Sequence, residues 1–206
     1  MPNFNEQTSR LMRAKTIGLV ICGGQSTRMG VDKSKIIYHG REQRYHVYKM
    51  LQQCCADTYL SCNMAQVDTV SKDYNFIADA KEYADIGPMA ALLTAMDKFS
   101  DADFLVLGCD YPLLDMNELN SFVGKLKGIN TAAAFYNSID NVYEPLLAYY
   151  PKNATNLLKD MFRKGNYSLQ QFLKQTSAMK HIPLDDTKTI SVDTPTDRAL
   201  IESKLK

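Results

Sequence analysis

The chain has 206 residues, of which 45% are hydrophobic, so it can bury one substantial core, and this length favours a single domain. Its 24 Lys and Arg against 23 Asp and Glu give a formal net charge of +1. That balance provides no overall field to attract nucleic acid or an anionic membrane. We therefore expect neither of those partners, and any anion site must be local.

The cysteines and the N-terminal segment indicate where the protein works. The five cysteines form no C-x-x-C pair, and two of them are adjacent, which fits neither a disulfide framework nor a zinc site. The first 15 residues lack the apolar stretch of roughly 7–15 residues that marks a signal peptide. No later segment approaches the length of about 18 apolar residues that spans a bilayer. We expect a soluble, cytoplasmic protein with a flexible leader at residues 1–14 and a single domain at residues 15–206.

Short apolar runs alternate with helical patterns along the chain. The first strand is expected at residues 16–22 (TIGLVIC), where a β-rich run stops at Gly23-Gly24. Further strands are expected at residues 58–62, 75–78, 103–108, 131–136, 146–150 and 181–184. Helices are expected at residues 45–55, 88–99, 115–127 and 153–165, from Ser168 and from Pro195, with Asp115, Asn153 and Ser168 as N-caps. This alternation predicts an α/β fold, a three-layer α/β/α sandwich with a mostly parallel sheet.

A carboxylate follows the clearest of these strands. Residues 103–108 (DFLVLG) are apolar through their centre and end at Cys109-Asp110-Tyr111-Pro112. In open α/β sheets, ligands bind beyond the carboxyl ends of the strands, and Mg²⁺ is commonly held by one or two carboxylates plus phosphate oxygens. Asp110 meets both conditions and is a candidate Mg²⁺ ligand. The alternative is that it only forms an Asx-turn before Tyr111-Pro112.

The loop after the first strand, CGGQSTRMGVDK, has the composition of a phosphate site. Its glycines let backbone N–H groups approach phosphate oxygens, while Arg28 offers a planar fork of donors and Lys33 a point charge. The loop contains neither G-x-x-x-x-G-K-[ST] nor G-x-G-x-x-G, which disfavours a kinase-like P-loop and an NAD site. Composition alone is equally typical of a polar surface loop.

The longer run ICGGQSTRMGVDK resembles L-A-G-G-x-S-x-R-M-G-x-D-K, the signature of MobA-like nucleotidyltransferases, the family of the molybdenum cofactor guanylyltransferases. The resemblance covers about residues 15–200 and implies a Rossmann-like nucleotidyltransferase fold. It further implies that Ile21, Cys22 and Gly23 contact the base and ribose, that Gly24 belongs to the nucleotide-binding loop, and that Lys33 reaches the phosphates. Cys22 replaces the family's alanine, and we interpret it as a small buried hydrophobe rather than a reactive thiol.

Three further segments match the family in order. Ser61-Cys62-Asn63 resembles a strand-end Ser-x-Asn whose asparagine lies at the nucleotide, and Ile77-Ala78-Asp79 resembles the aspartate that ends the next strand. An amide can read a base edge with donor and acceptor together, and a carboxylate can accept from guanine N1–H and its exocyclic amine. Asn63 and Asp79 are also ordinary strand-terminating residues. Cys109-Asp110-Tyr111-Pro112 matches C-D-x-P, whose aspartate binds Mg²⁺ in the family.

Two segments depart from the family pattern. Near the C-terminus, Ser191-Val192-Asp193-Thr194-Pro195 resembles N-x-N-T-P with a carboxylate in place of the second amide, which makes Asp193 a candidate second metal ligand. At residues 40–44 the chain reads GREQR where relatives usually carry G-K-P-L-L. Arg41 and Arg44 then either form a positive patch for a phosphorylated acceptor or begin a solvated helix.

The resemblance implies an enzyme, a nucleotidyltransferase that uses Mg²⁺ to transfer GMP from GTP to the terminal phosphate of molybdopterin with release of pyrophosphate. In this scheme Asp110 holds the metal against the α-phosphate, while Arg28 and Lys33 stabilise charge on the leaving pyrophosphate. The implied partners are GTP, a molybdopterin-type acceptor and, transiently, proteins of cofactor biosynthesis or cofactor acceptance. A cytidylyltransferase, a sugar-phosphate nucleotidyltransferase and a nucleotide-binding module without turnover remain the alternatives.

Overall fold

The computed structural model describes residues 16–22 and 31–205. Within these residues, seven strands form one sheet in the order β3-β2-β1-β4-β6-β5-β7. The strands are β1 (Thr16–Ile21), β2 (Asp57–Cys62), β3 (Phe76–Ala78), β4 (Asp103–Gly108), β5 (Ala133–Asn137), β6 (Val142–Tyr150) and β7 (Met179–His181). Strand β6 is antiparallel to β4 and β5, and the other neighbouring strands are parallel. The predicted mostly parallel α/β sheet is confirmed.

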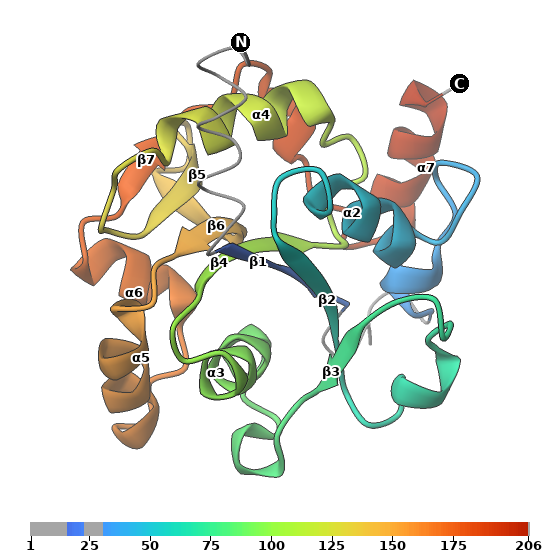
Figure 1. Cartoon of the computed structure of the whole chain (residues 1–206). Helices are drawn as coiled ribbons and strands as arrows, with labels where there is room; N and C mark the ends of the chain where they lie inside the picture. The colour runs from blue at the N-terminus through green and yellow to red at the C-terminus, as the bar shows by residue number, and fades with distance from the viewer. Residues whose placement is uncertain (1–15, 23–30, 206) are drawn as a thin grey trace, which may run out of the picture.

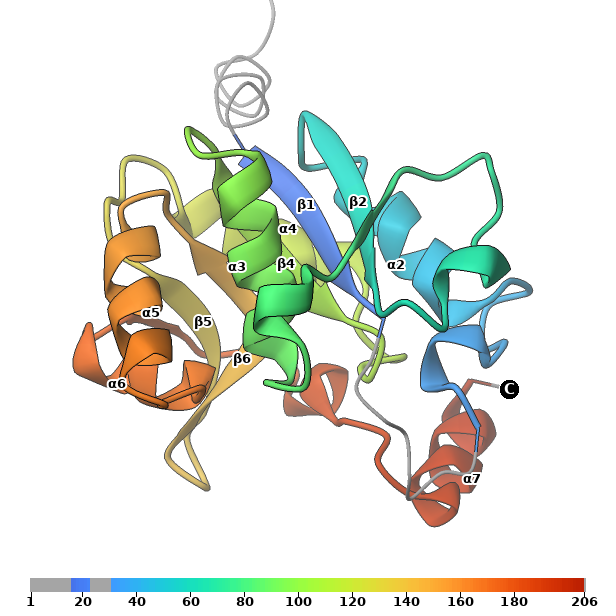
Figure 2. The same cartoon turned by 90° about the horizontal axis from the view of Figure 1, so that it is seen from below.

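Helices cover both faces of the sheet, which gives the predicted three layers (Figures 1 and 2). One face carries α2 (Gln43–Leu51) and α4 (Met116–Lys125), and the other carries α3 (Pro88–Lys98), α5 (Ala154–Arg163) and α6 (Leu169–Gln175). Helix α7 (Pro195–Lys204) lies near the carboxyl ends of β1 and β4 (Figure 2). Short 3-10 helices are η1 (Lys33–Lys35), η2 (Val67–Thr69), η3 (Lys81–Tyr83) and η4 (Asp186–Thr189).

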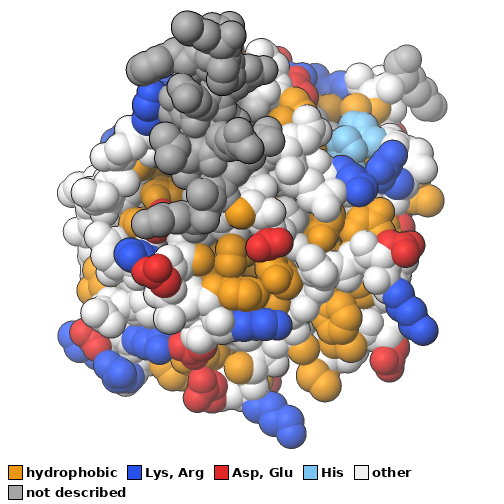
Figure 3. All heavy atoms as spheres, in the orientation of Figure 1, with side chains coloured by type: hydrophobic (Ala, Val, Ile, Leu, Met, Phe, Trp, Pro, Cys, Tyr) orange, Lys and Arg blue, Asp and Glu red, His pale blue; other side chains and the backbone are white. Residues whose placement is uncertain are grey.

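The surface of the molecule carries charges of both signs. On the face seen in Figure 3, acidic and basic side chains are interspersed, as the near-zero net charge leads one to expect. No helix in the described ranges is long and apolar enough to cross a membrane. The expected leader at residues 1–14 and the loop residues 23–30 lie outside the described residues.

Strand β1 lies inside the sheet, between β2 and β4, and is covered on both faces. All six of its residues are buried. Successive side chains of a strand point to opposite faces, so Leu19 and Ile21 join the core beneath α3, α5 and α6, while Val20 joins the core beneath α2 and α4. A strand covered on both faces has no polar side to present to water, which is why its sequence reads as one continuous apolar run.

Two strand boundaries, the start of β6 and the end of β7, differ by more than two residues from the sequence-based expectation, and proline accounts for both. Strand β6 begins at Val142, four residues before the expected start, and its register with β5 shifts between Ala134 and Phe135. This irregularity accommodates Pro145, which has no N–H for the ladder and whose carbonyl instead accepts from the Tyr150 hydroxyl at 2.9 Å. Strand β7 ends at His181 rather than beginning there, because Pro183 follows closely.

The predicted helix caps are mostly confirmed. The Asp115 side chain accepts from Glu118 N–H, and the Ser168 side chain accepts from Gln171 N–H, as N-caps do. The Asn153 cap is wrong: this side chain makes no capping bond and donates instead to the Asn130 carbonyl at 3.0 Å. Asn153 therefore ties α5 to the loop before β5 rather than closing the helix end.

Gly18 sets how closely α2 approaches the sheet. A Cβ at this position would lie 2.9 Å from Leu51 Cβ, 3.0 Å from Thr58 Oγ1 and 3.3 Å from Cys55 Sγ. Leu51 is buried in α2 and Thr58 is buried in β2, so neither can move far without disturbing the core. Glycine at this position lets the end of α2 rest directly on β1.

We predict that Gly18→Ala lowers the free energy of unfolding by about 1–3 kcal/mol, because the added methyl group overpacks the α2–β1 contact. Gly124→Ala is the matched control, since Gly124 is exposed in α4 and a Cβ there has no neighbour within 4 Å. The control should be neutral or stabilising by up to about 1 kcal/mol, owing to the helix propensity of alanine. Equal urea midpoints for Gly18→Ala and the unmodified chain would contradict this account of the packing.

Candidate functional site

The expected site residues follow the carboxyl ends of four neighbouring strands. Ile21 at the end of β1 is in register with Ser61 of β2 and Gly108 of β4, and Cys62 is in register with Ala78 of β3. Asn63 and Asp79 come directly after β2 and β3, and Asp110 follows β4 after Cys109, so the three residues lie along one edge of the sheet. Ligand sites in open α/β sheets form at this edge.

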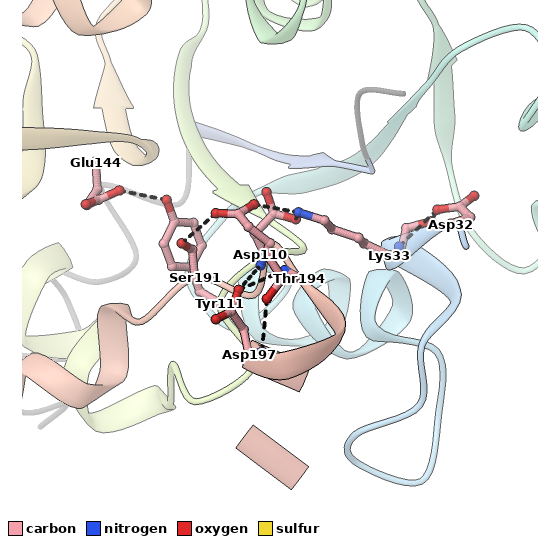
Figure 4. A network of polar contacts seen from close by, with 10 residues as sticks. Asp32, Lys33, Asp110, Tyr111, Glu144, Ser191, Thr194 and Asp197 are labelled. Carbon is pink, nitrogen blue, oxygen red and sulfur yellow. Dashed lines mark hydrogen bonds and ion pairs between the residues drawn. The ribbon is translucent and has the colours of Figure 1, made fainter. Parts of the chain in front are cut away.

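A charged cluster made of Lys33, Asp110 and Asp193 lies at this edge, and Figure 4 shows Lys33 and Asp110 in it. Lys33 Nζ donates to Asp193 Oδ1 at 2.6 Å and lies 3.8 Å from Asp110 Oδ1. The Lys33 side chain is only 15% exposed. Burial raises the pKa of Asp110, an effect that the nearby ammonium opposes. The hydrogen bond from Lys33 lowers the pKa of Asp193, so this carboxylate stays ionised around neutral pH.

The chain between η4 and α7 is held against β4, which brings Asp193 to the cluster. Val192 N–H donates to the Asp110 carbonyl at 2.8 Å, and the Val192 side chain packs with Ile36 and Ile201. Thr194 and Asp197 form a capping box at the start of α7. Ser191 Oγ also donates to Asp193 Oδ2 at 3.1 Å. These contacts fix the Asp193 carboxylate before any ligand arrives.

Asp79 and Asn63 lie side by side at the ends of β3 and β2. Asp79 Oδ1 accepts from the Ser61 hydroxyl at 2.8 Å, and burial raises the pKa of Asp79. Asn63 Oδ1 accepts from Gln66 N–H at 3.1 Å. One acceptor position of the Asn63 amide is thus used within the protein, so its NH₂ group is the part best placed to bond a ligand.

The charged cluster has the chemistry of a magnesium site. Among residues 16–22 and 31–205, no group of three or more His, Cys, Asp or Glu side chains is arranged to hold a metal ion alone. Asp110 and Asp193 nevertheless both approach one cation, the Lys33 ammonium. Mg²⁺ is commonly bound by one or two carboxylates, with phosphate oxygens and water completing the octahedron. The donor set therefore fits Mg²⁺ together with a phosphorylated substrate.

Three cysteines lie level with one another under this edge. Cys22 follows β1 between Cys62 of β2 and Cys109 after β4, and all three are buried. The pKa of the Cys22 thiol is raised, chiefly by its hydrogen bond with the Cys109 thiol, and that of Cys62 by its hydrogen bond with Cys22. Such thiols stay protonated, so the structure agrees with Cys22 as a small buried hydrophobe.

Arg44 does not contribute to a surface patch, and this half of the sequence-based expectation is wrong. Its side chain is 1% exposed and pairs with Glu42 Oε2 at 2.7 Å. It also donates to Thr69 Oγ1 at 3.1 Å and to Thr69 O at 2.7 Å. The position of Arg44 at the start of α2 suggested exposure, but the turn at η2 covers it. Arg41 is exposed, as expected.

Tyr111 and Glu144 border the site but were given no role by sequence reasoning. The Tyr111 hydroxyl donates to Glu144 Oε2 at 2.8 Å, next to Asp110 (Figure 4). Burial raises the pKa of both groups. The sequence signals were that Tyr111 directly follows Asp110 and that Glu144-Pro145-Leu146-Leu147-Ala148 resembles the family's E/R-P-L-x-A strand. Three other expected site residues, Gly23, Gly24 and Arg28, lie outside the described residues.

Comparison with known proteins gives relatives that are similar in sequence. The molybdenum cofactor guanylyltransferase of Pseudomonas putida is 27% identical over 157 residues, covering 75% of this chain and 80% of that protein. A molybdenum cofactor biosynthesis bifunctional protein of Synechocystis sp. is 27% identical over 187 residues, or 90% of this chain. This chain spans about half of the Synechocystis protein, 51% of its length.

A solved structure has the same fold. Molybdopterin-guanine dinucleotide biosynthesis protein A from Archaeoglobus fulgidus superimposes with a TM-score of 0.73 at 21% identity, covering 91% of this chain and 97% of that one. Residues 18–182 match the MobA-like NTP transferase domain, which is well over half of the chain. The chain therefore belongs to the MobA-like NTP transferase domain family and is a nucleotidyltransferase.

Proposed function

We propose that this nucleotidyltransferase transfers GMP from GTP to the terminal phosphate of molybdopterin in the cytoplasm, in a reaction that depends on Mg²⁺. The observation that carries the proposal is the cluster in which Lys33 meets Asp110 and Asp193, at the sheet edge where Asn63 and Asp79 also end their strands. The relatives named as molybdenum cofactor guanylyltransferases support the choice of donor and acceptor. Residues 15–206 would act as a single domain, because both helical layers pack on the same sheet.

The proposed reaction needs no nucleophile from the protein. An oxygen of the acceptor's terminal phosphate attacks the α-phosphorus of GTP, a new P–O bond forms, and the bond to the β-phosphate breaks to release pyrophosphate. Positioning and charge neutralisation then supply the catalysis. Lys33, with Arg28 of the preceding loop, would bind the outer phosphates and stabilise the charge that develops on the leaving group.

Asp110 would hold the magnesium ion, with Asp193 as a second ligand, and Gly23 and Gly24 would bring backbone N–H groups to the phosphates. Bound there, the metal supplies positive charge that polarises the α-phosphate. Ile21 and Cys22 would border the base and ribose. Asp79 is suited to guanine, because adjacent N1–H and N2–H donors can both bond a carboxylate, whereas N3 of cytosine is an acceptor that an ionised carboxylate repels.

Pyrophosphate release tests the reaction directly. With each of the four NTPs, Mg²⁺, and either molybdopterin or a sugar phosphate as acceptor, we expect the highest rate with GTP and molybdopterin. Turnover of a sugar phosphate in place of molybdopterin would show that the acceptor is wrong. Tight GTP binding without pyrophosphate release from any acceptor would instead identify a binding module.

We predict that Asp110→Ala reduces turnover by at least about 10²–10³-fold, the range typical of losing one preorganised electrostatic contact. Circular dichroism should show an intact fold, because the main-chain bond from Val192 to the Asp110 carbonyl remains. Asp160→Ala is the control, since Asp160 makes only an exposed ion pair with Arg163 on α5. Near-normal Mg²⁺-dependent turnover of Asp110→Ala would remove Asp110 from the metal site.

We predict that Asp79→Asn weakens the preference for GTP over CTP by on the order of 10²-fold, because the amide accepts fewer bonds from guanine and no longer repels cytosine N3. Mg²⁺ binding should not change. Asp97→Asn is the control: Asp97 accepts from the Tyr83 hydroxyl at 2.7 Å near the far end of α3 and should affect stability only. Titration calorimetry with both nucleotides measures the preference, and equal affinities in the unmodified protein would refute the guanine assignment.

A further inference from the structure

Gln66 joins the two halves of the proposed nucleotide site. Its side chain lies between Asn63, at the end of β2, and Asp32, which precedes Lys33. Gln66 Oε1 accepts from Asn63 N–H at 3.2 Å, and Gln66 Nε2 donates to Asp32 Oδ2 at 3.0 Å. Gln66 is 8% exposed, so these bonds lie largely away from water. One buried amide therefore contacts both the base side and the phosphate side of the edge.

The donor and acceptor directions in this contact are fixed. The main chain at Asn63 can only donate, so it needs the oxygen of the Gln66 amide, and the Asp32 carboxylate can only accept, so it needs the nitrogen. Asp32 Oδ1 is already occupied by Ser34 N–H at 3.0 Å and Ser34 Oγ at 2.7 Å. An amide satisfies both partners at once, whereas an ionised carboxylate or an aliphatic side chain cannot.

Arg44 anchors the Gln66 turn from the other side. Its guanidinium bonds both the hydroxyl and the carbonyl of Thr69, and the Thr69 hydroxyl donates to the Gln66 carbonyl at 2.7 Å. The Gln66 N–H donates to Asn63 Oδ1 at 3.1 Å, which fixes the position of the Asn63 amide oxygen. The Arg44–Glu42 pair thus anchors the turn that carries Gln66.

We propose that Gln66 is a positioning residue that sets the spacing between the base-contacting strand ends and the phosphate-contacting segment at Lys33. This inference rests on the proposed function, because it needs a ligand that reaches both sides. A nucleoside triphosphate gains from both sides only if they are already held at the spacing of its base and phosphates. A ligand that reaches one side gains little from Gln66.

The test reverses the hydrogen bond between Gln66 and Asp32. In Gln66→Glu, one carboxylate oxygen still accepts from Asn63 N–H, but the other faces Asp32, so at pH 8 the two charges repel. In Asp32→Asn, two NH₂ groups meet instead. In the double variant Asp32→Asn with Gln66→Glu, the new amide at 32 donates to the new carboxylate at 66, and Ser34 N–H keeps an oxygen acceptor. A double-mutant cycle then isolates the contact.

We expect Gln66→Glu to weaken GTP binding by roughly tenfold or more, because it leaves a poorly paired charge in a buried contact. Binding of guanosine, measured by ligand-observed NMR, should change less than threefold or so, since Asn63 keeps its partner. The double variant should recover most of the GTP affinity. Gln170→Leu is the matched control: Gln170 bonds Tyr143 N–H at 3.1 Å and Tyr143 O at 2.7 Å, and its loss should lower the melting temperature without changing GTP affinity.

Three results would overturn the inference: unchanged GTP affinity in Gln66→Glu, an equal loss for guanosine and GTP, or no recovery in the double variant. NTP binding by the unmodified protein distinguishes failure of this inference from failure of the proposed function. If it binds a different NTP, the guanine assignment fails and the same cycle is run with that NTP and its nucleoside. If it binds no NTP, both proposals fail.

Discussion

Parallel pairing of β1 with both of its neighbours is the constraint on which the site depends. Ile21 is in register with Ser61 on one side and Gly108 on the other, so the carboxyl ends of three neighbouring strands lie level with one another. In a parallel sheet the carboxyl ends share one edge, and residues that follow them converge without any contact between distant loops. Gly18 contributes to the same constraint, because it lets α2 close over β1 and hold the sheet's central strands in place.

Three charged side chains, Lys33, Asp110 and Asp193, lie together on this edge. The Lys33 ammonium is nearly enclosed and is balanced by Asp193, while Asp110 is held in a partly dehydrated position that favours a cation beside it. A phosphate group arriving alone would have to compete with Asp193 for Lys33. A phosphate arriving with a divalent cation would leave each carboxylate with a positive partner, so the two acidic side chains are compatible with the proposed nucleotide site.

Sequence reasoning predicted the parts of the fold that depend on local pattern. The apolar runs of β1 and β4, the caps at Asp115 and Ser168, and the position of Asp110 after a strand follow from neighbouring residues alone. The contact of Lys33 with Asp193 joins residues 160 positions apart and depends on how the C-terminal segment folds back. Arg44 has the sequence context of a surface residue, and only the turn at η2 buries it. Pro145 concealed the first half of β6 because a proline seldom lies in a paired strand.

The buried cysteines beneath this edge make local opening of the protein measurable by alkylation. An alkylating reagent reacts with a thiolate that it can reach, and Cys22, Cys62 and Cys109 are all buried, while the raised pKa values of Cys22 and Cys62 keep these two thiols protonated. Modification at these positions therefore requires the strand ends to separate, whereas modification at Cys54 and Cys55, which are also buried, requires the end of α2 to lift. The alkylation rates at the two places would measure the opening free energy of this edge of the sheet and of the α2 layer separately, without any engineered cysteine.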